Sequence, residues 1–294
     1  MLKIPSVDDW FRLSLKYRDF HRLSHTVLKD YGYMAIQEYL DERPELRRIL
    51  EFGHGFTATL FQRYGEDREV WGIDDFQGLH YFPSDRAEWE ARFDREVRAK
   101  TANCTFRRGL LGSQSKADLP NAYFDVICSV SVLEEVPIDV ARDILRHAAS
   151  LLKPGGVLIG THDLLTAFPA RVGEYISAHA EMGLALDEPY PVISLCGHRL
   201  LLESPTAVML LYQENEGDDR KFLGHWTTIW TVATKCTSAT VPTGSPELIL
   251  APLPITSPPE PAAAPPFSLM HSAWSMRRFL PAAFSVRNLL SRLH

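Results

Sequence analysis

Short apolar segments alternate with helical patterns through the middle of this chain, and the alternation restricts the folds that it can adopt. Segments that read as strands cover residues 48–52, 69–73, 104–107, 124–130 and 156–161. Strands that alternate with helices are typical of βα units, whose strands pair in parallel. Two later segments, 207–213 and 227–234, flank an acidic turn and predict an antiparallel hairpin. The expected fold is an α/β sheet, mostly parallel, closed by a terminal antiparallel hairpin.

The ends of the chain differ in composition from this central part. Residues 1–43 have helical periodicity and predict an N-terminal helical cap, which leaves residues 44–236 for the α/β domain. Half of the 20 prolines fall between Pro242 and Pro281, which predicts a linker at 237–268 that cannot build a core. Residues 269–294 combine apolar side chains with arginines and no acid. We expect either a basic amphipathic tail that binds an anionic membrane or a protein partner, or a tail without fixed structure.

Charge and cysteine content narrow the function classes. The formal net charge of −6 gives the chain as a whole no electrostatic reason to bind nucleic acid. The 4 cysteines lie far apart, with no pair at the spacing of a metal site, so we expect reduced thiols and no metal. No segment has the apolar pattern of a signal peptide or the length of a membrane span, which predicts a cytoplasmic protein.

The first of three motifs follows the first expected strand. Residues 49–57 read ILEFGHGFT, so a strand that ends near Glu51 passes into a turn with Gly53, His54 and Gly55 and then into a helix. Glycines in such a turn let a ligand lie against the backbone at the carboxyl ends of the strands. The motif alone is weak, because dinucleotide-binding loops share it.

The second motif follows the next strand, where residues 70–76 read VWGIDDF. Asp74 comes about 20 residues after the glycine turn, the spacing at which an acidic side chain accepts hydrogen bonds from a ribose diol. Enzymes that use NAD and enzymes that use S-adenosylmethionine both have this arrangement. The two motifs together predict a ligand of the adenosine type but do not distinguish NAD from S-adenosylmethionine.

The third motif covers residues 123–137, YFDVICSVSVLEEVP, and residues 151–159, LLKPGGVLI. In this order and spacing, the chain resembles the class I (Rossmann-like) S-adenosylmethionine-dependent methyltransferases, most of all their small-molecule branch. The resemblance extends over residues 48–161. It implies a Rossmann-like fold and S-adenosylmethionine as the cofactor.

The resemblance also implies positions for the cofactor. Glu51 would attract its ammonium group, and the turn from Gly53 through His54 to Gly55 would hold its amino-acid end. Asp74, with Asp75 beside it, would bind the ribose hydroxyls.

The adenine and methionine ends follow in the same way. Phe76 would pack on the adenine. Members of the family often have an acid after the third strand to bind the adenine amino group, and this chain has none there; main-chain groups at Leu110 or Leu111 are expected to replace it. After the fourth strand, Ser129 and Val130 would line the methionine pocket.

Methyl transfer requires placement of the acceptor, and a general base where the acceptor is a hydroxyl. His162 and Asp163 follow the fifth strand, and we expect His162 to act as that base with Asp163 orienting it. The family commonly has Glu-His where this chain has Glu134-Glu135, and those two acids are expected to be charges at a helix N-terminus.

The predicted function is therefore methylation, on oxygen, of a small-molecule or glycan-like acceptor. Two alternatives stay open: a catalytically silent methyltransferase-like scaffold that binds a partner, and an NAD-dependent oxidoreductase. The sequence leaves the acceptor and the oligomeric state undetermined.

Overall fold

The computed structural model describes residues 2–3, 5, 7–17, 27–55, 57–76, 86–101, 103–113, 115, 117–165, 170–186, 193–196, 199–202, 209–215 and 221–236. The chain divides into two units, Met1–Pro252 and Leu253–His294, and the described residues all belong to the first. The expected linker at 237–268 and tail at 269–294 lie outside the described residues. None of the described helices is both long and apolar enough to cross a bilayer.

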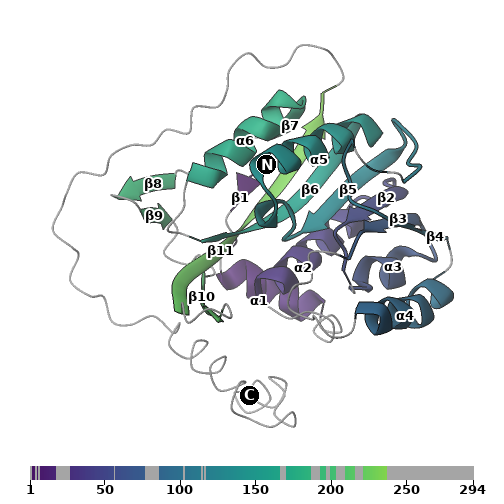
Figure 1. The fold of residues 1–294 in the computed structure, drawn as a ribbon, viewed down its shortest axis with the longest axis horizontal. Coiled ribbons are helices and arrows are strands. Elements are labelled where there is room, and N and C mark those ends of the chain that lie inside the picture. The colour runs from purple at the N-terminus through teal and green to yellow at the C-terminus, as the bar shows by residue number, and fades with distance from the viewer. Residues whose placement is uncertain are drawn as a thin grey trace, which may run out of the picture. The chain divides into compact units, whose positions relative to one another are not determined.

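Within the described residues, nine strands form one sheet (Figure 1). Its main path runs in the order β1-β11-β6-β5-β2-β3-β4, and β7 and β10 also pair with β11. The strands are β1 (Leu2–Lys3), β2 (Arg48–Phe52), β3 (Glu69–Asp74), β4 (Cys104–Arg108), β5 (Phe124–Val130), β6 (Leu152–Leu165), β7 (Leu184–Leu186), β10 (Met209–Asn215) and β11 (Lys221–Lys235). Two further strands, β8 (Ile193–Cys196) and β9 (Arg199–Leu202), pair with each other.

The pairing confirms the predicted topology. Strands β2, β3, β4, β5 and β6 pair in parallel, whereas β11 pairs antiparallel with β6 and with β10. The bounds of β2 and β5 are those expected from the sequence. Strand β6 begins earlier than expected, at Leu152, because Leu152 already pairs with Phe124 of β5. The fold is the mostly parallel, Rossmann-like sheet with a terminal antiparallel hairpin.

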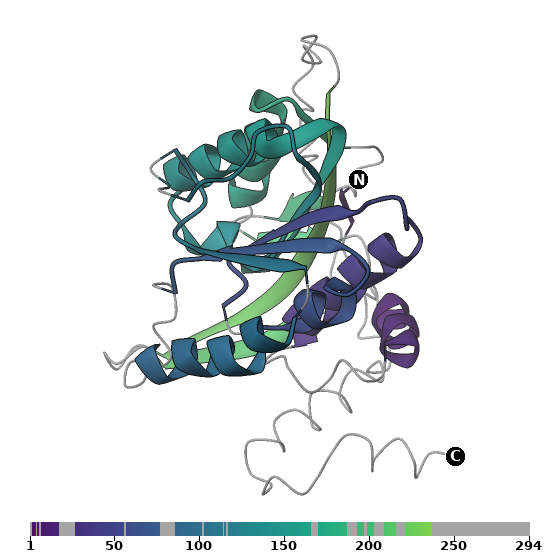
Figure 2. The ribbon, with the colours of Figure 1, turned by 90° about the vertical axis from the view of Figure 1, so that its right-hand side faces the viewer.

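Helices cover both faces of this sheet (Figure 2). The helices are α1 (Val7–Lys16), α2 (Val27–Asp41), α3 (Thr59–Tyr64), α4 (Arg86–Glu96), α5 (Ile138–Leu151) and α6 (Ala170–Glu181), with 3-10 turns η2 (Arg98–Lys100) and η3 (Leu133–Glu135). Helices α5 and α6 lie on one face, and α2 and α3 lie on the other with α1 outside α2.

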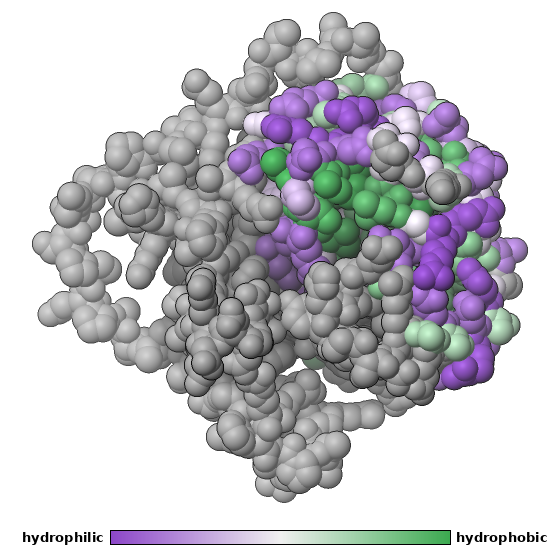
Figure 3. All heavy atoms as spheres, in the orientation of Figure 1, coloured by the Kyte–Doolittle hydropathy of each residue, from purple (hydrophilic) through white to green (hydrophobic). Residues whose placement is uncertain are grey.

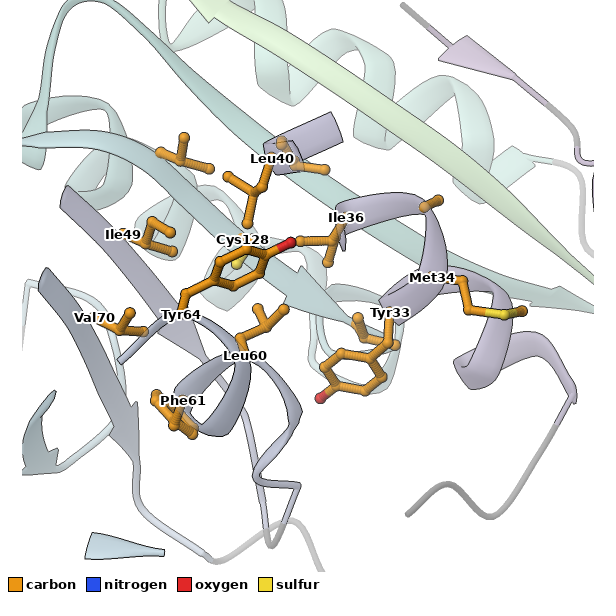
Figure 4. Packing of buried hydrophobic residues seen from close by; sticks show 14 of the residues in the cluster. Tyr33, Met34, Ile36, Leu40, Ile49, Leu60, Phe61, Tyr64, Val70 and Cys128 are labelled. Atoms are coloured by element: carbon orange, nitrogen blue, oxygen red, sulfur yellow. The ribbon is translucent and has the colours of Figure 1, made fainter. Parts of the chain in front are cut away.

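Side-chain alternation along each strand produces two separate apolar cores. On β5 and β6, Ile127 and Leu158 face α5, whereas Cys128 and Ile159 face α2. Figure 4 shows the α2 side, where side chains from α2, α3 and the strands meet: Ile36, Leu40, Leu60, Phe61, Ile49, Val70 and Cys128. On the face shown in Figure 3, an area of apolar side chains is bordered above and to its right by hydrophilic ones.

Helix α2 lies directly on the sheet, so the segment expected to be a cap also forms a layer of the α/β fold. The approach is closest at Gly32, where a Cβ atom would lie 2.8 Å from Thr161 Oγ1 and 3.0 Å from Val130 Cγ1. Only glycine fits at this distance. The close packing brings the next residue, Tyr33, to the carboxyl end of β2.

Candidate active site

The glycine turn after β2 has the backbone conformation that its sequence predicts. Gly53 and Gly55 have φ values of 67° and 53°, in the left-handed region where side chains are strained. A Cβ atom on Gly53 would lie 2.4 Å from Val132 Cγ2, on the segment that follows β5. The turn therefore packs against the segment that follows β5. On the opposite side of the turn, the two glycines have no side chains that would keep a ligand away from the backbone.

Glu51 is fully buried at the end of β2 (0% exposed). The hydroxyl of Tyr33 donates a hydrogen bond to Glu51 Oε1 at 2.8 Å, and among the described residues Glu51 Oε2 has no hydrogen-bond partner. Burial raises the pKa of Glu51 to about 8; the negative charge of Asp74 adds to this effect and the Tyr33 hydrogen bond opposes it. A buried carboxyl with an unused oxygen is a site that a cation would stabilise.

Asp74, at the end of β3, stabilises the glycine turn by a hydrogen bond. Its Oδ2 accepts from the Gly55 main-chain N–H at 2.7 Å, and its Oδ1 accepts from the Phe76 N–H at 2.6 Å. A carboxylate oxygen has two lone pairs, so each oxygen can accept one further hydrogen bond, as from a ribose hydroxyl. Asp75 is half-buried beside it, and Phe76 adopts a positive φ of 56°.

His54 lies in an aromatic cluster beneath the turn rather than facing its open side. Its ring stacks on Phe93 at 5.0 Å and meets Phe61 and Phe76 edge to face at 5.2 and 5.7 Å. Burial lowers the pKa of His54, and the charge of Asp74 opposes this effect. The side chain therefore supports the turn, and only its main chain is in a position to meet a ligand there.

The loop after β4 is fixed to helix α5. Asp143 Oδ2 accepts from the main-chain N–H and the hydroxyl of Ser113 at 2.7 and 2.9 Å, and His147 Nδ1 accepts from the Gly112 N–H at 3.1 Å. Of the two residues expected to meet adenine, Leu110 is 45% exposed, whereas Leu111 is buried in the core.

The ends of β5 and β6 carry buried hydroxyls. Ser129 and Val130 are buried at the end of β5, and Val130 faces α2. Ser131 follows with a φ of 55°, held by a hydrogen bond from its N–H to the Thr161 carbonyl at 3.0 Å. A non-glycine residue in this conformation costs free energy, which is common at functional sites.

His162 and Asp163 are neighbours on β6, so their side chains point to opposite faces of the sheet. His162 stacks on Tyr175 of α6, with ring centroids 5.3 Å apart, and burial lowers its pKa to about 4. Its Nε2 lies 3.3 Å from Thr231 Oγ1. The expected arrangement, in which Asp163 orients His162 by a hydrogen bond, does not occur in the described structure, because alternation along the strand separates the two side chains.

Asp163 has the properties of a base. Burial, followed by the nearby charge of Glu134, raises the pKa of Asp163 to about 7. Hydrogen bonds with the hydroxyls of Ser131 and Thr228 oppose this rise. A carboxyl whose pKa is near neutral can accept a proton at physiological pH.

Glu134 belongs to the same cluster, although its sequence position did not predict this. Its Oε1 accepts from the Asp163 main-chain N–H at 2.7 Å, and its Oε2 lies 3.8 Å from His162 Nδ1. The sequence feature that could have indicated this role is the position of Glu134 soon after the end of β5, in the segment LEEVP. From the sequence we expect only a charge at a helix N-terminus at this position.

Among the buried oxygens without a hydrogen-bond partner in the described structure are Glu51 Oε2 on β2 and Thr161 Oγ1 on β6. Buried polar groups are nearly always paired, so an unpaired group indicates an absent partner. The arrangement suits a polar ligand with a cationic group at one end.

Similarity to a known family extends over more than half of the chain. A family model described as a methyltransferase domain matches residues 25–185. A search of curated proteins finds no match.

Several solved structures are similar in fold. An S-adenosylmethionine-dependent methyltransferase from Methanosarcina mazei is 15% identical, with 69% of this chain and 98% of that chain covered and a TM-score of 0.41. The YcgJ protein of Bacillus subtilis is 13% identical, with 69% and 100% covered and a TM-score of 0.44. The N-methyltransferase NodS of Bradyrhizobium japonicum, in complex with S-adenosylhomocysteine, is 16% identical, with 77% and 98% covered and a TM-score of 0.42.

Proposed function

Because this chain belongs to the methyltransferase domain family, we propose that it binds S-adenosylmethionine at the ends of β2, β3 and β5 and transfers the methyl group to an acceptor. The observation that carries the proposal is Glu51, a fully buried carboxyl whose Oε2 has no hydrogen-bond partner in the described structure. The ammonium group of S-adenosylmethionine would supply that partner. An anionic ligand such as sulfate would not, because its charge would repel the carboxylate, and a cation favours the ionised carboxylate more strongly than a neutral donor does.

The other residues of the site fit the remaining parts of this cofactor. Asp74 keeps free lone pairs for ribose hydroxyls, and the bare backbone of Gly53 and Gly55 lets a ligand approach closely. Phe76 and the exposed Leu110 would flank the adenine, and Ser129 and Val130 would line the methionine pocket. When bound, S-adenosylmethionine supplies a methyl group that its sulfonium already activates.

For the acceptor, we propose an oxygen of a small-molecule or glycan-like substrate, with Asp163 rather than His162 as the base. Asp163 would take the proton of the acceptor hydroxyl while the oxygen-carbon bond forms and the sulfur-carbon bond breaks. Its pKa of about 7 supports this role. His162, whose pKa is lowered to about 4 and whose ring is stacked on Tyr175, is better suited to packing.

Two other functions predict different results. A silent scaffold would retain the fold without binding the cofactor, and an NAD-dependent oxidoreductase would bind nicotinamide dinucleotides; family membership favours neither. The deciding experiment incubates the protein with methyl-labelled S-adenosylmethionine and panels of hydroxylated small molecules, oligosaccharides and amines. We expect labelled hydroxyl products, and at least about tenfold less product from Asp163→Asn. Products labelled only on amines would overturn the oxygen assignment, and no label in any panel together with no cofactor binding would favour the scaffold.

A further inference from the structure

We propose that Glu134 is a positioning residue that fixes the main chain of Asp163 by a hydrogen bond and, through its charge, influences the Asp163 carboxyl group. The inference rests on the proposed function above, in which Asp163 takes the proton of the acceptor. The Glu134 side chain is only 8% exposed. A favourable charge at a helix N-terminus does not require such burial, so the burial of Glu134 calls for another role.

The sheet gives the reason for the hydrogen bond. Strand β5 ends at Val130, whose partner on β6 is Thr161, and the Ser131 N–H still reaches the Thr161 carbonyl. Main-chain groups two residues apart on a strand point to the same side, so the Asp163 N–H also points toward β5, beyond its end. Glu134 Oε1 accepts that N–H at 2.7 Å. A side-chain carboxylate thus takes the place of the strand that has ended and holds the main chain of Asp163.

The charges around Asp163 come from three elements. Glu134 of η3 raises the pKa of Asp163, Lys29 of α2 lowers it, and His162 precedes it on β6. Because His162 has its pKa lowered to about 4, it is neutral near pH 7 and does not cancel the charge of Glu134. The imidazole ring of His162, whose Nδ1 lies 3.8 Å from Glu134 Oε2, is therefore uncharged near pH 7.

The test is a direct titration of the carboxyl carbon of Asp163 by NMR, with aspartate labelled with ¹³C and the signal assigned by its loss in Asp163→Asn. Glu134→Gln retains an acceptor oxygen for the Asp163 N–H but removes the charge. We expect it to lower the pKa of Asp163 by about one unit or more. Glu135→Gln, at the exposed next position of the same turn, is the matched control and is expected to leave that pKa nearly unchanged. An unchanged pKa in Glu134→Gln, or an equal shift in Glu135→Gln, would overturn the proposal.

A second measurement covers the case in which Glu134→Gln does not fold. The carboxyl carbon of Glu134 is titrated in the wild-type protein and in Asp163→Asn. Two coupled groups report each other's ionisation, so we expect the Glu134 signal to show a second step near pH 7 that disappears in Asp163→Asn. Identical curves in the two proteins would overturn the inference.

S-adenosylhomocysteine binding, measured by calorimetry on the same samples, separates the two proposals. Coupled carboxyls in a protein that does not bind this compound would contradict the proposed function and leave the coupling in place. Independent carboxyls in a protein that binds it would contradict the inference alone.

Discussion

Asp74 Oδ2 accepts a hydrogen bond from the main-chain N–H of Gly55 at 2.7 Å, so a side chain at the end of β3 determines the conformation of the turn after β2. The other oxygen of Asp74 accepts from the Phe76 N–H at 2.6 Å. One carboxylate therefore organises two loops at the carboxyl edge of the sheet. The same group is proposed to bind the ribose, which couples the shape of the site to its affinity.

Asp74→Asn should destabilise these loops. An amide has one acceptor oxygen, so one of the two main-chain N–H groups loses its partner and the amide NH₂ faces it instead. We expect the free energy of unfolding to fall by about 1–3 kcal/mol, measured with urea. Asp67→Asn, an exposed position in the turn before the same strand, should change it by less than about 0.5 kcal/mol. Equal effects of the two substitutions would contradict this role of Asp74.

Gly53→Ala should destabilise the protein more than Gly155→Ala, because the two glycines have similar φ values but different surroundings. Gly155 has a φ of 75°, and a Cβ atom there would have no heavy atom within 4 Å, so Gly155→Ala measures the conformational cost alone, about 1 kcal/mol. Gly53 has a similar φ of 67°, and its Cβ atom would also meet Val132 Cγ2 at 2.4 Å. For Gly53→Ala we expect a loss of about 2–4 kcal/mol in the free energy of unfolding, measured with urea.

The double variant Gly53→Ala with Val132→Ala isolates the steric part of that loss. Removing the two methyl groups of Val132 should restore part of the stability lost in Gly53→Ala, relative to Val132→Ala alone. Additive effects in this cycle would show that the contact with Val132 is not what requires glycine.

Glu51 should make the free protein less stable as the pH rises. Its pKa of about 8 in the folded protein exceeds the ordinary value of 4.5, so between these values the folded protein holds a proton that the unfolded chain has released. The contribution of Glu51 to stability therefore decreases from about pH 5 to pH 8. We expect Glu51→Gln to gain stability over the wild type across this range in urea unfolding. Parallel pH profiles of the two proteins would contradict the shifted pKa.

Ser131→Gly should stabilise the protein while impairing its site. Glycine removes the strain of a φ of 55°, although it also removes a hydroxyl that hydrogen-bonds to Asp163. We expect a gain of about 1 kcal/mol in the free energy of unfolding. Ala122→Gly, which relieves a φ of 48° in an exposed turn, is the matched control. Only Ser131→Gly should weaken binding of S-adenosylhomocysteine, and unchanged binding would assign Ser131 no part in the site.

The parallel strands and the closing hairpin could be predicted because their signals are local. Apolar runs, turn residues and the helical period between residues 138 and 151 lie within short windows of sequence. Strands β1 and β7 could not be predicted, because no local signal marks them. Each is short, and each exists because it pairs with β11 far along the chain, which no local pattern encodes.

The site was predictable where a residue's position on a strand determines its role. Glu51 and Asp74 lie at the carboxyl ends of β2 and β3, at the edge of the sheet that the sequence indicates. The partners of these groups were not predictable, since Tyr33 reaches Glu51 only because Gly32 lets α2 approach the sheet. The relation between His162 and Asp163 could not be predicted from their adjacency in sequence, because alternation along β6 turns their side chains to opposite faces of the sheet.

The most direct test of the account is calorimetric titration of the wild type and Glu51→Gln with S-adenosylhomocysteine, near pH 7, in two buffers of different ionisation enthalpy. Glu51→Gln keeps the size of the side chain and an acceptor for Tyr33, so a loss of binding would not reflect a loss of fold. We predict binding by the wild type with release of a proton from Glu51 as the ammonium group arrives, and about tenfold or weaker binding without that release in Glu51→Gln. No binding by the wild type, or equal affinity and equal proton release in both proteins, would contradict the proposed cofactor site.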